Sequence, residues 1–163
     1  MKIKWLLFFL LLFGITGYFR EFFFVHMNRI MYEKFYHVSA YEHDSMPAIM
    51  SVFNSWSYPA LYYSKYPFTL LFTFIFFALS WLTLKKLTNN KVLLKILLFT
   101  YIVMLLIAGV SMLYGYLVCN RLQSDEYTLS RWLLGIAQSP IICLILLASE
   151  KLYNNTIQSS PKK

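Results

Sequence analysis

Residues 96–118 of the chain read ILLFTYIVMLLIAGVSMLYGYLV, an unbroken run without a charged side chain. A transmembrane helix needs about 20 predominantly apolar residues to cross the ~30 Å hydrocarbon core of a bilayer. Several other stretches of the chain have the same character, which favours spanning helices over one large soluble core. The sequence therefore predicts an integral membrane protein.

The overall composition agrees with this prediction. Hydrophobic residues make up 59% of the 163 residues, aromatic residues 20% and charged residues only 13%, whereas about a quarter of the residues of a soluble domain are charged. The formal net charge is +8, but the lysines flank the apolar runs, where orientation in the membrane explains them better than nucleic acid does. We expect no nucleic-acid partner.

The apolar runs predict an all-α fold with four transmembrane helices. The first run follows Lys2 and Lys4, but it lacks an Ala-x-Ala cleavage pattern and more apolar residues follow Arg20 and Glu21, so we interpret it as an uncleaved anchor. Pro140 breaks one backbone hydrogen bond inside the last span. The four predicted spans cover about residues 5–25, 62–84, 96–118 and 131–149 of a single membrane domain, 1–153, which a disordered cytoplasmic tail, 154–163, follows.

The distribution of basic residues predicts the orientation, because cytoplasmic segments carry an excess of Lys and Arg. Both termini are then cytoplasmic, and the composition, rich in Lys, Asn and Phe, suggests a bacterial inner membrane. All arginines and histidines fall on the outer side, where arginine suits carboxylate or phosphate groups. We expect Arg20, Arg29 and Arg121 to contact anions or lipid headgroups. The lysines assigned to the cytoplasm are Lys2, Lys4, Lys85, Lys86, Lys91, Lys95, Lys151, Lys162 and Lys163.

Polar side chains recur at helical spacing near the outer boundary. Glu21 lies on one stripe of the first span, and Arg131 and Gln138 share a face of the fourth. The three could line a substrate pocket, or they could form an interhelical clasp that serves packing. Small residues at spacings of three and four predict helix-packing seams, at Gly14, Gly17, Ala108, Ser111, Gly115 and Gly135.

The outer loop between the first two spans is rich in aromatic residues and methionine. Residues 22–35 and 46–53 have patterns typical of helices that lie on a membrane surface. These segments either cap the bundle or dock a partner protein. The residues assigned to a docking loop are Phe22, Phe23, Met31, Phe35 and Trp56.

The sequence provides little support for a metal, a cofactor or a named reaction. His26, His37 and His43 lie in the outer segment, but no His-x-x-x-His or Glu-x-x-His spacing places two ligands on one helical face. No Gly-x-Ser-x-Gly turn is present. We expect no metal and no cofactor, and we assign no catalytic residue.

Two functional hypotheses follow. The preferred one is a non-enzymatic accessory or assembly subunit that binds lipid and other integral membrane or envelope proteins through its outer loop. The alternative is a small membrane enzyme or carrier that binds a lipid-linked or anionic substrate at an outer-face Arg/Glu pocket. Replacing Glu21 by Gln separates them, since an enzyme loses turnover while a clasp loses stability or assembly.

Overall fold

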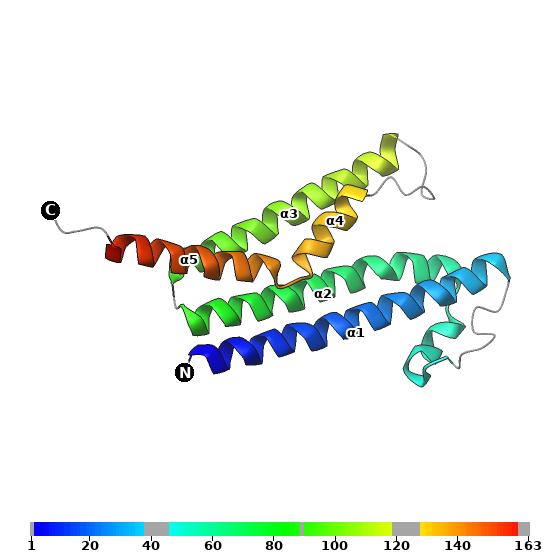
Figure 1. Cartoon of the computed structure of the whole chain (residues 1–163). Helices are drawn as coiled ribbons and strands as arrows, with labels where there is room; N and C mark the ends of the chain where they lie inside the picture. Colours follow the sequence, from blue (N-terminus) through cyan, green and yellow to red (C-terminus); the bar gives the residue numbers. More distant parts are fainter. Residues whose placement is uncertain (1, 38–45, 89, 119–127, 160–163) are drawn as a thin grey trace. The chain divides into compact units, whose positions relative to one another are not determined.

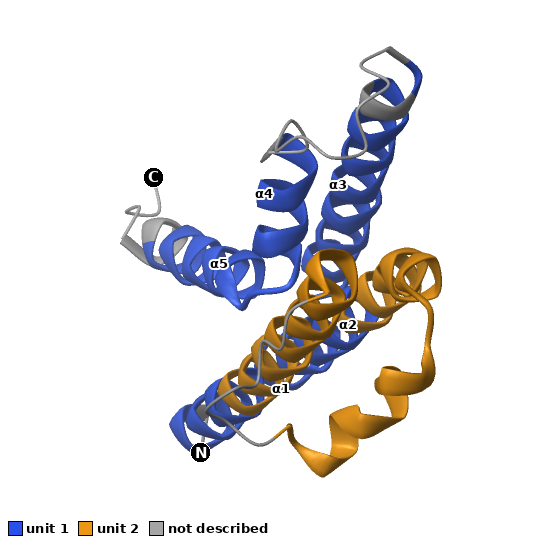
Figure 2. Cartoon of the chain, turned by 90° about the vertical axis from the view of Figure 1, so that its right-hand side faces the viewer, with its two compact units in different colours: residues 1–13, 73–163 blue, residues 14–72 orange. Residues whose placement is uncertain are grey.

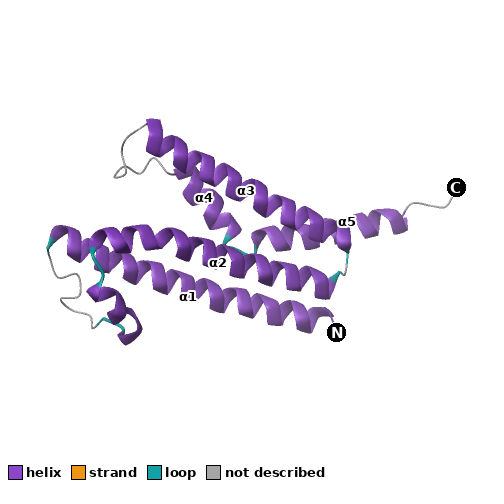
Figure 3. Cartoon of the chain, turned by 180° about the vertical axis from the view of Figure 1, so that it is seen from behind, coloured by secondary structure: helices purple, strands orange, loops and turns teal. Residues whose placement is uncertain are grey.

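The computed structural model describes residues 2–37, 46–88, 90–118 and 128–159, and within these ranges it contains helices and no strand (Figures 1 and 3). The all-α prediction is therefore confirmed for the described residues. The helices are α1 (Lys2–Tyr36), the 3₁₀ helix η1 (Ala48–Ser55), α2 (Tyr58–Leu87), α3 (Lys91–Val118), α4 (Thr128–Ala137) and α5 (Ile141–Ser159).

Among the described residues, three helices are long and apolar enough to cross a membrane, and a bent helix pair provides a possible fourth span. The three contain residues Ile3–Tyr36, Tyr58–Leu87 and Lys91–Tyr114. The pair consists of α4 and α5, which meet at 60° across residues 138–140 (Figure 1). The continuous helix predicted for 131–149 is thus replaced by two helices. Pro140 has no N–H and disfavours helical geometry at Ser139, so the helix stops rather than losing a single bond.

Local capping explains where several helices begin and end. The backbone of His37 has φ 55°, the left-handed conformation that commonly terminates a helix. Asn90 accepts a hydrogen bond at Oδ1 from the N–H of Val92 at 3.0 Å, which caps the start of α3. Two helices extend beyond the predicted spans: α1 continues past residue 25 to Tyr36, and α5 continues past residue 149 to Ser159. The disordered tail predicted for 154–163 remains a prediction.

The chain divides into two compact units, each described by itself (Figure 2). Unit 1 comprises residues 1–13 and 73–163, and unit 2 comprises residues 14–72. The single domain predicted for residues 1–153 remains a prediction. The buried core of unit 1 consists of Phe13, Phe76, Leu84, Leu97, Tyr101, Ala137, Ile142 and Cys143, and that of unit 2 of Met27, Ile30, Met31, Met50 and Leu61.

Candidate functional site

The break between α4 and α5 satisfies its own backbone with local hydrogen bonds. The N–H and the hydroxyl of Ser139 both donate to the carbonyl of Ile136, at 3.2 and 2.7 Å. The N–H of Leu144 donates to the carbonyl of Pro140 at 2.9 Å, so Pro140 begins the hydrogen-bonding pattern of α5. Irregular backbone at membrane depth is tolerated only where it is buried in protein or lines a cavity, so these bonds matter for the fold.

Two long-range hydrogen bonds attach this break to α2 and α3. The amide Nε2 of Gln138 donates to Thr73 Oγ1 at 2.9 Å, and the hydroxyl of Tyr101 donates to the carbonyl of Ala137 at 2.9 Å. Gln138 is 5% exposed and Thr73 2% exposed. We call these four residues the break cluster. Both bonds join residues that are distant in sequence, so the break cluster ties the turn between α4 and α5 to α2 and α3.

Apolar and weakly polar side chains pack around the break cluster. The buried thiol of Cys143 donates a weak hydrogen bond to the carbonyl of Ser80 at 3.9 Å. The rings of Phe77 and Tyr101 meet edge to face, with centroids 5.1 Å apart. The hydroxyl of Ser80 is fully buried and has no hydrogen-bond partner among the described residues.

The three residues of the predicted polar cluster have different surroundings. Gln138 is buried in the break cluster, whereas Arg131, in α4, is exposed. Glu21 belongs to unit 2, where its carboxylate lies 3.8 Å from Arg20 Nη1 and its side chain is 69% exposed. The meeting of Glu21 with Arg131 remains a prediction. Sequence reasoning found Gln138 but missed Thr73 and Tyr101.

Most of the predicted anion contacts and packing seams lie on α1, α3 and α4. Arg29 is exposed on α1, and Arg121 lies outside the described residues. Ala108 is buried on α3, which packs against α4, and Ser111 is half-buried on the same helix. An added Cβ at Gly14, Gly17 or Gly135 would meet no described atom within 4 Å, and Gly115 lies in α3 with surroundings outside the described part.

The predicted docking loop divides into packed and exposed residues. Met31 belongs to the buried core of unit 2, and Phe22 and Phe23 pack against that core. Phe35 and Trp56 are 46% and 37% exposed. Three of the five predicted docking residues therefore contribute to the packing of unit 2.

The 3₁₀ helix η1 presents two apolar side chains that sequence reasoning did not assign to the docking loop. Ile49 is 75% exposed and Val52 is 64% exposed, while Met50 between them is fully buried. Residues three apart lie on the same side of a 3₁₀ helix, so Ile49 and Val52 share a face. We call this pair the η1 face.

Contacts with α1 hold η1 in place. Lys34 Nζ, on α1, donates to the carbonyl of Asn54 at 2.8 Å. The rings of Phe53 and Phe23 meet edge to face at 5.6 Å. These contacts, together with the burial of Met50, keep the η1 face outward.

The histidines provide no metal centre within the described residues, where no group of three or more His, Cys, Asp or Glu could hold an ion. A ring nitrogen of His26 instead bonds to the carbonyl of Phe22 at 2.8 Å. His43 lies outside the described residues.

Comparison of the chain with protein-family models, with curated proteins and with solved structures gives no match.

Proposed function

We propose that the chain is a non-enzymatic accessory or assembly subunit of a membrane complex and that it binds a partner protein through the η1 face. The observation that carries the proposal is the exposure of Ile49 and Val52 on a segment that Met50 and Lys34 hold in place. Exposed apolar side chains on an ordered element mark sites of interaction with proteins or membranes.

The periodicity of η1 supports this assignment. Met50 and Phe53, three residues apart, point toward the core of unit 2, while Ile49 and Val52 form another side of the helix, about 120° away. Burying apolar surface stabilises a protein or a complex by about 25 cal/mol per Å². Unit 2 does not bury the side chains of the η1 face, so they give it no such stabilisation. A partner that covers both side chains would bury this surface, which would stabilise the complex.

Helix α1 offers a partner further apolar surface. Among the described residues, only 11% of the apolar stretch of α1 is buried, against 28% of that of α2. Helices of a partner can pack closely at Gly14 and Gly17, where a Cβ would meet no described atom. Orientation remains a proposal: the positive-inside rule puts the η1 face on the outer side, at an envelope membrane.

The experiment is site-specific photo-crosslinking in intact cells at native expression level. A crosslinker replaces Ile49 in one strain, Val52 in a second and Leu106, a 62% exposed residue of α3, in a third. The proposal expects one protein adduct, shared by positions 49 and 52 and absent at 106. The Ile49→Ser/Val52→Ser variant should then lose the same companion during purification in mild detergent.

Two results would overturn the proposal. Crosslinks to lipid alone at positions 49 and 52 would identify the η1 face as a membrane-contacting surface. Purification of the chain without a companion protein, but with a bound anion or lipid-linked molecule, would favour an enzyme or carrier. The loss of turnover in Glu21→Gln would then be tested first.

A further inference from the structure

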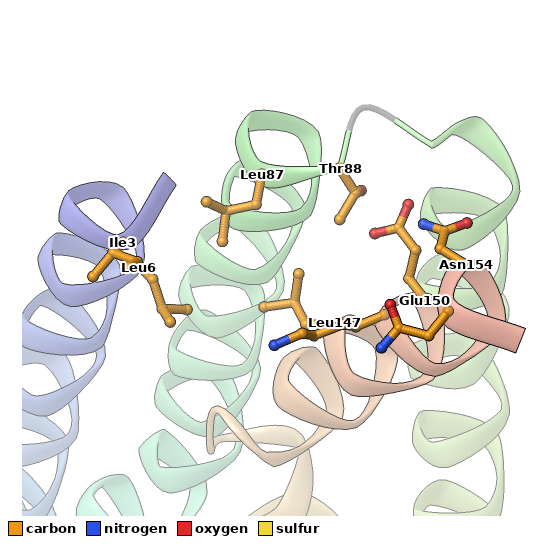
Figure 4. A pocket seen from close by; sticks show the side chains of 9 residues that line it. Ile3, Leu6, Leu87, Thr88, Leu147, Glu150 and Asn154 are labelled. Atoms are coloured by element: carbon orange, nitrogen blue, oxygen red, sulfur yellow. The ribbon is translucent and has the colours of Figure 1, made fainter. Parts of the chain in front are cut away.

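A pocket of about 370 Å³ lies at the lysine-rich end of unit 1 (Figure 4). The beginning of α1, the end of α2 and residues 147–155 of α5 surround it. Its position coincides with the ends of apolar segments, where a bilayer's headgroups would lie if these helices span a membrane. The lining residues are Ile3, Leu6, Leu87, Thr88, Leu147, Glu150, Lys151, Asn154 and Asn155.

The lining separates into an apolar and a polar part. Figure 4 shows Ile3 and Leu6 on one side of the pocket and Thr88, Glu150 and Asn154 on the other. The hydroxyl of Thr88 already donates to the carbonyl of Leu84 at 2.8 Å. Recognition of a polar ligand therefore depends on the charged and amide groups of α5, which belong to Glu150, Lys151, Asn154 and Asn155. Such a lining suits an amphipathic molecule.

Glu150 is the unusual member of this lining. It is half-buried, and it forms no hydrogen bond or ion pair with the described residues. It is also the only acidic residue in the sequence after Glu126, and it lies in a region otherwise rich in lysine. Its neighbour Lys151 points about 100° away around the helix, and adjacent positions do not face each other. A partly desolvated carboxylate at a membrane boundary requires water or a cationic partner.

We propose that this pocket binds the headgroup of an aminophospholipid, with phosphatidylethanolamine as the ligand. The primary ammonium of ethanolamine carries N–H donors for Glu150 and the amide oxygen of Asn154, and such charge-assisted hydrogen bonds are the strong ones. The ammonium of Lys151 attracts the phosphate. The first carbons of an acyl chain contact Ile3 and Leu6. This site is separate from the η1 face and does not depend on the function proposed for it.

The size of the pocket fits this ligand. About 370 Å³ lies near the lower end of the ~300–1,000 Å³ typical of small-molecule sites. That volume holds a headgroup and the adjoining part of one chain, while the rest of the lipid remains in the bilayer. Phosphatidylcholine presents a quaternary ammonium without N–H donors, and phosphatidylglycerol presents no cation, so both lack the group that Glu150 recognises.

The test titrates the purified full-length chain in detergent with palmitoyl-oleoyl phosphatidylethanolamine, phosphatidylcholine or phosphatidylglycerol and counts bound lipids by native mass spectrometry. We expect phosphatidylethanolamine to bind about tenfold more tightly than phosphatidylcholine, the ratio that one additional charged hydrogen bond supports. Glu150→Gln should reduce this ratio to near one. Glu33→Gln, a matched substitution on α1 outside the pocket, should leave the ratio unchanged.

A second variant tests the apolar side of the pocket. Leu147→Trp fills the space and should weaken binding of all three lipids, while Glu150→Gln removes only the discrimination between headgroups. Circular dichroism and thermal unfolding verify that both variants are folded. Equal affinity of the wild type for phosphatidylethanolamine and phosphatidylcholine, or a ratio unchanged in Glu150→Gln, would overturn the proposal. So would equally strong competition by soluble phosphoethanolamine, since the ligand would then be a small solute.

Discussion

Gln138 donates a hydrogen bond of 2.9 Å to Thr73, a residue 65 positions earlier in the sequence. The bond joins α2 to the turn between α4 and α5, and both side chains are almost fully buried. Tyr101 contributes a second bond from α3 to the last carbonyl of α4. A broken helix in an apolar setting needs such partners because unsatisfied backbone and amide groups are costly there.

The pair should show energetic coupling. Gln138→Leu and Thr73→Val should each lower the free energy of unfolding by about 1 kcal/mol, and the coupling between them should be near the ~0.6 kcal/mol average for hydrogen bonds between membrane helices. Unfolding of the wild type, both single variants and the double variant in mixed micelles gives the coupling directly. Strictly additive losses would mean that the hydrogen bond does not contribute.

Removing the hydroxyl of Tyr101 should lower the free energy of unfolding more than removing the hydroxyl of Tyr114, another tyrosine on α3. Tyr101→Phe removes the donor to Ala137 and leaves a buried carbonyl unpaired, which should cost about 1–3 kcal/mol of unfolding free energy. Tyr114→Phe is the matched control, because Tyr114 is 63% exposed and should tolerate the change. If the two variants have the same free energy of unfolding in mixed micelles, the hydrogen bond from Tyr101 to Ala137 does not stabilise the fold.

The sequence predicts the helices well and the partners of the break poorly. Gln138 is conspicuous because an amide stands out in an apolar run. Thr73 is not, since threonine in such a helix commonly bonds to the carbonyl four residues earlier, as Thr83 does with Leu79 at 2.7 Å. Nothing in one sequence tells which threonine faces a neighbouring helix. Tyr101 is equally hidden among aromatic residues that suit lipid.

The predicted docking loop shows a second limit of sequence reasoning. The sequence pattern assigns Phe22, Phe23 and Met31 to a docking surface because apolar residues there alternate with charges. In the structure they pack inside unit 2, against partners such as Phe53 that lie far along the chain. The three-residue period of η1, which separates Met50 from Ile49 and Val52, is too short a pattern to recognise before its packing is known.

Pro140 should determine the angle between α4 and α5. With spin labels at Leu129 and Leu152, which are both exposed, a straight helix would separate the two positions by about 35 Å. Pro140→Ala restores an N–H and removes the steric restriction on Ser139, so the distance measured by pulsed electron paramagnetic resonance should lengthen toward that value. Pro59→Ala, at the first turn of α2, is the control and should leave it unchanged. An unaltered distance in Pro140→Ala would assign the bend to the break cluster instead.

Met50 should hold η1 on unit 2. Its side chain is fully buried, whereas that of Ile49 is 75% exposed. Truncating a buried methionine lowers stability by about 2–5 kcal/mol. Here the substitution should mainly weaken the packing of η1 against the rest of unit 2. In Met50→Ala, amide hydrogens of residues 48–55 should therefore exchange faster while those of α3 stay protected. Ile49→Ala should leave the exchange of η1 nearly unchanged.

The same two variants separate anchoring from docking. If a partner covers the η1 face, Ile49→Ala weakens the complex because it removes contact area, although η1 stays attached. Met50→Ala weakens it by a different route, since the face is intact but no longer held in position, so the partner must order η1 on binding. Adding the partner should then restore slow exchange in Met50→Ala. A partner that binds Met50→Ala and wild type equally would show that the attachment of η1 is irrelevant to docking.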